Sequence, residues 1–93
     1  MSYLLRVFSS NLRKYRNNLG LSQEAFANKV GLHRTYISAL ECGKRSIAIA
    51  NIERIADALG IDAYLLFLDN QKNHPQITNE ESSYEFNNSE RKI

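Results

Sequence analysis

Apolar residues recur at intervals of three and four through most of the first 60 residues, and this spacing constrains the fold more than any other feature. The first run consists of Leu5, Phe8, Leu12, Tyr15 and Leu19. Such a run is the buried stripe of an amphipathic helix. Three further runs follow, and each of the four is closed by a glycine, which suits the left-handed turn that ends a helix. These glycines are Gly20, Gly31, Gly43 and Gly60. With no strand alternation, hairpin signal or internal repeat, the sequence predicts an all-α fold.

The ends of the later helices can also be placed. Ser22 is suited to cap the second helix, because its hydroxyl can accept a free backbone N–H. The third helix is expected over residues 33–41, and Asp62 is expected to cap a short fifth helix that runs through Leu68. Together these segments predict one compact helical domain over residues 1–69.

The distribution of charge is more informative than its total. The 93 residues carry a formal net charge of +2. Residues 1–45 contain eight cationic residues and only two acidic ones, Glu24 and Glu41, which gives a net charge of +6. Residues 70–93 carry a net charge of −1. The basic half is the part that a polyanion would meet. Within it, Arg16 is suited to pair with an acid, and Glu41 to close the third helix.

Several functional classes are not expected from this sequence. Cys42 is the single cysteine, which excludes an internal disulfide and a cysteine-cluster metal site. His33 and His74 are too isolated to hold a metal, and no catalytic constellation or glycine-rich phosphate loop is present. The apolar opening is too short for a membrane span and is interrupted by Arg6. We therefore expect no enzymatic activity, cofactor, metal site or membrane contact, and a cytoplasmic, nucleoid-associated location.

The composition changes at residue 70. Residues 70–93 are rich in Asn, Ser, Glu and Gln and contain Pro75, the only proline. A segment of this kind buries too little apolar surface to offset its ordering entropy, so we expect a polar, disordered tail. The alternative is that Tyr84 and Phe86 belong to a small binding segment.

Residues 23–40 form a unit of two helices and a tight turn. Ala27 is small enough for two helix axes to approach closely, and Gly31 allows the chain to reverse between them. Ile37 and Leu40 then hold the second helix against the first. This is the helix-turn-helix arrangement, whose second helix enters the major groove of DNA.

The front of that second helix and the loop behind it carry the candidate DNA contacts. Arg34 is suited to direct readout, because its guanidinium pairs bidentately with guanine O6 and N7. Cations in the loop are suited to phosphates. Tyr36 is open to two interpretations, a core aromatic or a contact with the DNA backbone, and each exposed member could instead be a solvated side chain. The predicted set is Gln23, His33, Arg34, Thr35, Tyr36, Ser38, Lys44 and Arg45.

The second half of the domain carries more apolar residues than one small core can hide. A self-complementary patch between two copies is the economical account of such a surplus, and a well-filled core is the alternative. The predicted dimer surface consists of Ile47, Ile49, Leu65, Leu66 and Phe67.

These features together resemble the Cro/C1 (XRE) family of helix-turn-helix repressors, over roughly residues 8–68. The residues that carry the resemblance are Gln23, Phe26, Ala27, Gly31, Leu32, Ile37, Ser38, Leu40, Glu41 and Gly43. The stretch RTYIS followed by a Lys-Arg loop is most similar to the controller proteins of restriction–modification systems. Two departures are His33, where members often carry a Ser or Thr N-cap, and the absence of a proline near Ile47.

The resemblance implies a five-helix domain, a homodimer and a palindromic double-stranded DNA operator. It further implies that Gln23 bridges a phosphate to the recognition helix, and it admits a contact with RNA polymerase. We therefore expect a sequence-specific transcriptional regulator that acts as a homodimer on an inverted repeat, as a restriction–modification controller does. The alternative is an antitoxin, or a phage or plasmid repressor, whose tail over residues 70–93 binds a protein partner.

Overall fold

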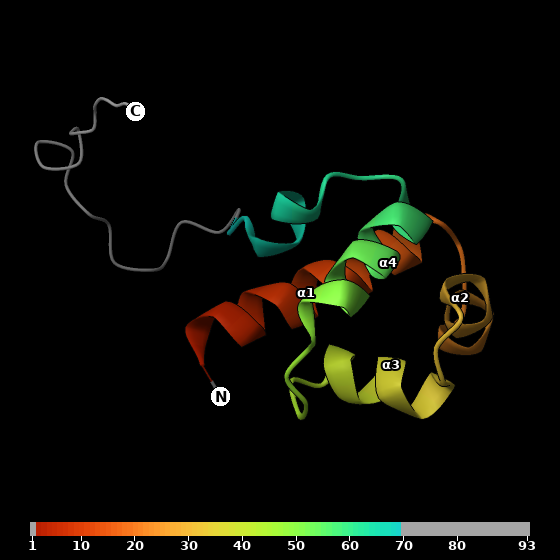
Figure 1. Cartoon of the computed structure of the whole chain (residues 1–93), viewed down its shortest axis with the longest axis horizontal. Coiled ribbons are helices and arrows are strands. Elements are labelled where there is room, and N and C mark those ends of the chain that lie inside the picture. Colours follow the sequence, from red (N-terminus) through yellow and green to blue (C-terminus); the bar gives the residue numbers. More distant parts are fainter. Residues whose placement is uncertain (1, 70–93) are drawn as a thin grey trace, which may run out of the picture.

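The computed structural model describes residues 2–69, and all regular structure in that range is helical (Figure 1). The elements are α1 (Tyr3–Asn18), α2 (Gln23–Val30), α3 (Arg34–Glu41), α4 (Ile49–Leu59) and the 3-10 helix η1 (Ala63–Phe67). None of these helices has the length and apolar character needed to cross a membrane. The prediction of an all-α fold is confirmed over residues 2–69, whereas the predicted tail lies outside the described residues.

A helix lies at the position of the fifth predicted helix, but it is a 3-10 helix of five residues, η1, so a fifth α-helix is not confirmed. The side chain of Asp62 makes no capping hydrogen bond at its start. At its end, the buried Asn11 of α1 donates Nδ2 to the carbonyl oxygens of Leu66 and Leu68, each at 2.9 Å. These carbonyls therefore find their donor on α1 rather than in a further helical turn.

The ends of α2 follow the sequence prediction. The Ser22 hydroxyl accepts a hydrogen bond from the backbone N–H of Ala25 at 3.0 Å. Gly31 ends the helix with a φ of +85°, in the left-handed region that favours glycine. Arg54 of α4 completes this end, because its Nη2 donates to the carbonyl oxygens of Val30 at 3.2 Å and Gly31 at 3.0 Å.

The core lies where α1 packs against α3 and η1, and where α2 packs against α3 and α4. Its largest fully buried side chains come from all five elements. They are Phe8, Leu12, Phe26, Ile37, Leu40, Ile55 and Leu66. The inner side of α3 is thus pinned by Ile37 and Leu40, and α3 lies along one edge of the domain (Figure 1). The packing leaves the opposite side of α3 available for contact.

The predicted dimer surface needs one correction. Leu66 has no exposed area, because its side chain fills the core, so its assignment to an interface is wrong. Phe67 is half-buried and stacks on Phe8 with ring centroids 5.4 Å apart. Ile47 and Leu65 are also half-buried. Ile49, in contrast, is 78% exposed.

Candidate nucleic-acid interface

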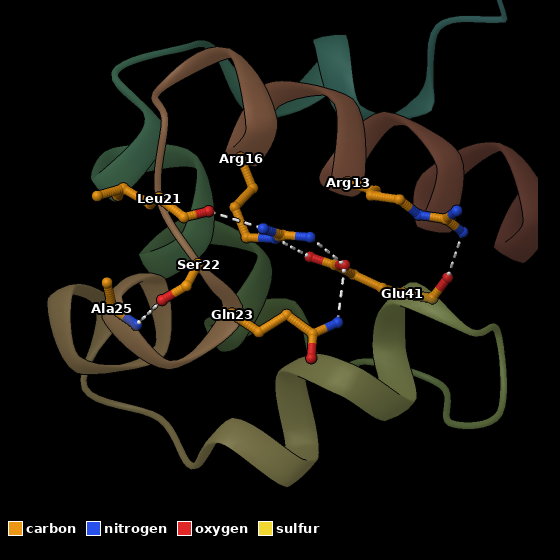
Figure 2. Close-up of polar contacts among 7 residues, drawn as sticks. All are labelled: Arg13, Arg16, Leu21, Ser22, Gln23, Ala25 and Glu41. Atoms are coloured by element: carbon orange, nitrogen blue, oxygen red, sulfur yellow. Dashed lines mark hydrogen bonds and ion pairs between the residues drawn. The ribbon is translucent and has the colours of Figure 1, made fainter.

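The C-terminal end of α3 is held by a buried ion pair between Arg16 and Glu41 (Figure 2). Arg16 donates Nε to Glu41 Oε2 at 2.6 Å and Nη2 to Oε1 at 3.0 Å. This two-point contact raises the pKa of the Arg16 guanidinium above its ordinary value, although burial opposes the shift. Both side chains are largely removed from water, and two parallel charge-assisted hydrogen bonds fix their geometry. The prediction that Arg16 pairs with an acid is confirmed.

Further hydrogen bonds join this end of α3 to α1. The Ser9 hydroxyl donates to the carbonyl oxygen of Leu40 at 2.6 Å, and Arg13 Nη2 donates to that of Glu41 at 3.2 Å. Arg16 Nη1 also donates to the carbonyl oxygen of Leu21 at 2.7 Å, before α2 begins. The last turn of α3 is therefore fixed in position by the longest helix of the domain.

Gln23 joins the first turn of α2 to the same carboxylate (Figure 2). Its Nε2 donates to Glu41 Oε1 at 3.1 Å, and the side chain is half-buried. Because a carboxylate only accepts hydrogen bonds, the amide nitrogen of Gln23 must face it. A second N–H of the same nitrogen remains for another acceptor. The predicted phosphate contact of Gln23 is compatible with this geometry and stays a prediction.

The N-terminal end of α3 is built differently, because its polar side chains are exposed. His33, Arg34 and Thr35 are exposed, and His33 occupies the N-cap position without a side-chain hydrogen bond to the helix. Ser38, one turn further along, is half-buried. The loop behind the helix carries Lys44 and Arg45, both exposed.

Tyr36 packs as the first of its two interpretations predicts, and its contact with the DNA backbone stays a prediction. Its ring is half-buried and packs against the core, whereas its hydroxyl takes part in a hydrogen bond with a residue of α4. Asn51 Nδ2 of α4 donates to the Tyr36 hydroxyl oxygen at 3.1 Å. The guanidinium carbon of Arg45 lies 5.1 Å from the ring centroid, within range of a cation–π contact. Arg45, predicted as a phosphate contact, therefore lies against an aromatic ring of α3.

An open hollow brings part of the predicted set together beside the start of α3. It is lined by Leu32, His33, Thr35, Tyr36, Arg45 and Asn51. Gln23 does not line this hollow, since it lies at Glu41, near the other end of α3. The hollow combines apolar and aromatic side chains with a cation and an amide.

Asn51 is not among the site residues predicted from the sequence. It lies in the first turn of α4, fifteen residues from its partner Tyr36. No local signal identifies it, because an asparagine off the apolar stripe of a helix is ordinarily a solvated residue. Its contact with Tyr36 exists only because the fold brings the first turn of α4 close to α3.

A family model described as HTH_3, helix-turn-helix, matches residues 12–66. This range is more than half of the chain and includes α2 and α3 completely. The chain belongs to this helix-turn-helix family, and it is a DNA-binding transcription regulator of the XRE type.

The relatives identify the branch of the family. A hypothetical transcription factor of Neisseria meningitidis serogroup B is 46% identical over 76 residues, which cover 82% of this chain and 72% of that protein. The control protein C.MunI of a Mycoplasma species is 44% identical over 66 residues, which cover 70% of this chain and 89% of that protein. The predicted resemblance to restriction–modification controller proteins is confirmed.

Solved structures agree with this placement. The crystal structure of the hypothetical transcription factor NHTF from Neisseria superposes with a TM-score of 0.70 at 48% identity, covering 72% of this chain and 77% of that one. The tetramer of the controller protein C.Esp1396I, in complex with its natural 35-base-pair operator, superposes with a TM-score of 0.66 at 36% identity. That match covers 72% of this chain and 88% of that one.

Proposed function

We propose that this protein is a restriction–modification controller that binds an inverted-repeat operator as a homodimer. The observation that carries the proposal is the construction of α3. Arg34 and Thr35 are exposed at its front, while Glu41 at its other end is locked to α1 by two charge-assisted hydrogen bonds. A helix held in this way presents the same side chains to each DNA site it meets. The complex of C.Esp1396I with its operator supports this role for a related protein.

The roles within the site follow from chemistry. Arg34 reads a guanine edge through its two-pronged guanidinium, and Thr35 contacts a neighbouring base edge or a thymine methyl. Lys44 and Arg45 neutralise phosphates and set the position of the helix on the duplex. Gln23 adds a phosphate contact at the start of α2, using the N–H that Glu41 leaves available.

The dimer is proposed to form through α4 and η1, which pack against each other. Apolar side chains on these elements and directly after them remain in contact with water, with Ile49 78%, Tyr64 66% and Leu68 45% exposed. Covering such side chains in a symmetric interface removes apolar area from water. A two-fold dimer then places its two recognition helices roughly 34 Å, or about 10 base pairs, apart.

The operator is tested by footprinting the protein on the DNA upstream of its own gene, with a selection from random duplexes alongside. The proposal expects protection of two inverted half-sites about 10 base pairs apart, centre to centre. Protection of a single unrepeated site would contradict it. A reporter fused to the same DNA tests regulation, and activation would support the contact with RNA polymerase that the resemblance admits.

The dimer is tested by sedimentation of the wild type and of Ile49→Asn. The wild type should sediment as a dimer at tens of micromolar, and Ile49→Asn should shift toward monomer while remaining folded. Leu19→Asn is the matched control, because Leu19 is 45% exposed at the end of α1, outside the elements proposed to form the interface. A monomeric wild type, or equal effects of the two variants, would contradict the assignment.

A further inference from the structure

Asn51 lies outside the helix-turn-helix unit, yet it contacts the recognition helix. It is half-buried in the first turn of α4, and its Nδ2 donates to the Tyr36 hydroxyl oxygen at 3.1 Å. Tyr36 itself lies in the first turn of α3, directly after the exposed Arg34 and Thr35. The contact therefore joins α4 to the end of α3 that faces the DNA in the proposed function.

The direction of this hydrogen bond determines what the Tyr36 hydroxyl can still do. A phenolic hydroxyl has one hydrogen to donate and an oxygen that accepts. Because Asn51 supplies the donor, the hydroxyl oxygen acts as acceptor and its hydrogen stays available. The guanidinium of Arg45 lies 5.1 Å from the ring centroid, within range of a cation–π contact that helps to hold the ring in place.

The surroundings restrict where this hydrogen can go. The ring of Tyr36 is half-buried against the core, which limits its rotation, and Asn51 limits the position of the oxygen. Both residues line the open hollow together with Thr35 and Arg45. The free donor thus belongs to a surface that also carries a base-reading candidate and a phosphate-binding candidate.

We infer that Asn51 is a positioning residue for DNA recognition, which holds Tyr36 so that its hydroxyl donates a hydrogen bond to an acceptor on the DNA. The acceptor is a phosphate oxygen or the oxygen or nitrogen of a base edge. This inference rests on the proposed function and adds to it a residue of α4 that never touches the DNA itself.

The test is a double-mutant cycle with Asn51→Ala, Tyr36→Phe and the double variant. Each is titrated with the duplex that the wild type selects from random DNA and with a scrambled duplex of equal length. Each single variant should bind the selected duplex about two- to tenfold more weakly, which is the range for one hydrogen bond. The double variant should bind within about twofold of Tyr36→Phe, because Asn51 acts only through the hydroxyl. If the two losses multiply instead, or if Asn51→Ala has no effect, the inference is overturned.

A third variant tests the direction of the hydrogen bond. Asp has nearly the shape of Asn but only accepts, so Asn51→Asp draws the Tyr36 hydrogen away from the DNA. Asn51→Asp should bind at least as weakly as Asn51→Ala when Tyr36 is present, and binding equal to the wild type would contradict the inference. In the Tyr36→Phe background, any difference between the Asp and Ala variants measures charge repulsion alone. Asn18→Ala, at an exposed position near the end of α1, is the matched control and should bind as the wild type does.

The scrambled duplex separates the two sources of the acceptor. Equal losses on both duplexes identify a phosphate oxygen, and a loss confined to the selected duplex identifies a base edge. Thermal unfolding of every variant is measured to check that the fold is kept. A wild type that prefers no duplex would refute the proposed function, whereas a selective wild type with an unaffected Asn51→Ala would refute this inference alone.

Discussion

α3 is eight residues long, and its two ends are held by different kinds of contact. At the C-terminal end, Glu41 is 3% exposed and receives charge-assisted hydrogen bonds from Arg16. At the N-terminal end, Arg34 is exposed and His33 leaves the helix without a side-chain cap. The buried end fixes the direction of the helix, and the exposed end keeps its donors available to a ligand. In the proposed function, stability and recognition are thus separated along one short helix, and substitutions should separate them as well.

Glu41→Ala should give the largest effect, because it breaks the buried end. It leaves the Arg16 guanidinium without its partner inside the domain and should lower the free energy of unfolding by about 3–5 kcal/mol. Urea denaturation followed by circular dichroism measures this loss. Arg13→Ala is the control, since it removes one hydrogen bond to the Glu41 carbonyl and should cost only about 0.5–1.5 kcal/mol. Similar losses for the two variants would show that the ion pair does not anchor the helix.

Gly31→Ala should give the next largest effect, because it alters the turn that leads into the exposed end. A non-glycine residue in the left-handed region costs about 1–2 kcal/mol. A Cβ at Gly31 would also lie 2.8 Å from Arg54 Nη2 and displace the guanidinium from its carbonyl partners.

Gly20→Ala is the matched control for that substitution. Gly20 has a φ of +74°, and a Cβ there meets nothing within 4 Å. The free energy of unfolding of Gly20→Ala should therefore fall by the backbone cost alone. That of Gly31→Ala should fall by about 1 kcal/mol more, because the Arg54 hydrogen bonds are also lost. Equal losses in denaturation experiments would exclude a role for Arg54 in closing α2.

Arg45→Ala should leave stability almost unchanged and alter the response of DNA binding to salt. Loss of a phosphate contact weakens specific and scrambled DNA about equally, and lowers the slope of log K against log salt by roughly one per contact. Titrations at several salt concentrations provide the slope. A changed base preference with an unchanged slope would instead place Arg45 at a base edge.

His33→Ser should change stability only slightly, and in the favourable direction. The backbone at His33 is extended, with φ −75° and ψ 145°, close to that of the capping Ser22. A serine there can cap α3 and should raise the free energy of unfolding by about 0.5–1 kcal/mol. The same change removes the predicted contact of His33 with DNA, so affinity should fall while stability rises. If stability and affinity both fell, a serine at position 33 would not cap α3, and the prediction would be contradicted.

The parts of the fold that depend on local pattern were predictable. The helix ends at Gly31 and Gly60 and the cap at Ser22 follow from spacing and backbone preference, and the structure confirms them. The basic front of α3 was predictable too, because polar residues opposite a pinned apolar stripe must face water. These signals act over one or two helical turns, which is the range a single sequence reports well.

The parts that depend on tertiary contacts were not predictable to the same degree. The apolar run that contains Leu66 and Phe67 has no helical spacing, so the sequence could not tell the buried member from its half-buried neighbour. The 3-10 form of η1 depends on Asn11, which donates from α1 across 55 residues to Leu66. The hydrogen bond between Asn51 and Tyr36 likewise needs the packing of two helices. Arg16 was expected to pair with an acid, but its partner was not identified.

The most direct test of the account is the preference of Arg34→Ala for the selected duplex over a scrambled one, measured beside its thermal stability. Arg34 is exposed at the recognition end and makes no contact with the buried network of Glu41. If the front of α3 reads the DNA, the melting temperature of Arg34→Ala should stay at the wild-type value. Its affinity for the selected duplex should fall by about 1–3 kcal/mol per half-site, with preference relaxed at one base position. An equal loss on both duplexes, or unchanged binding to both, would contradict the claim that the front of α3 reads the DNA.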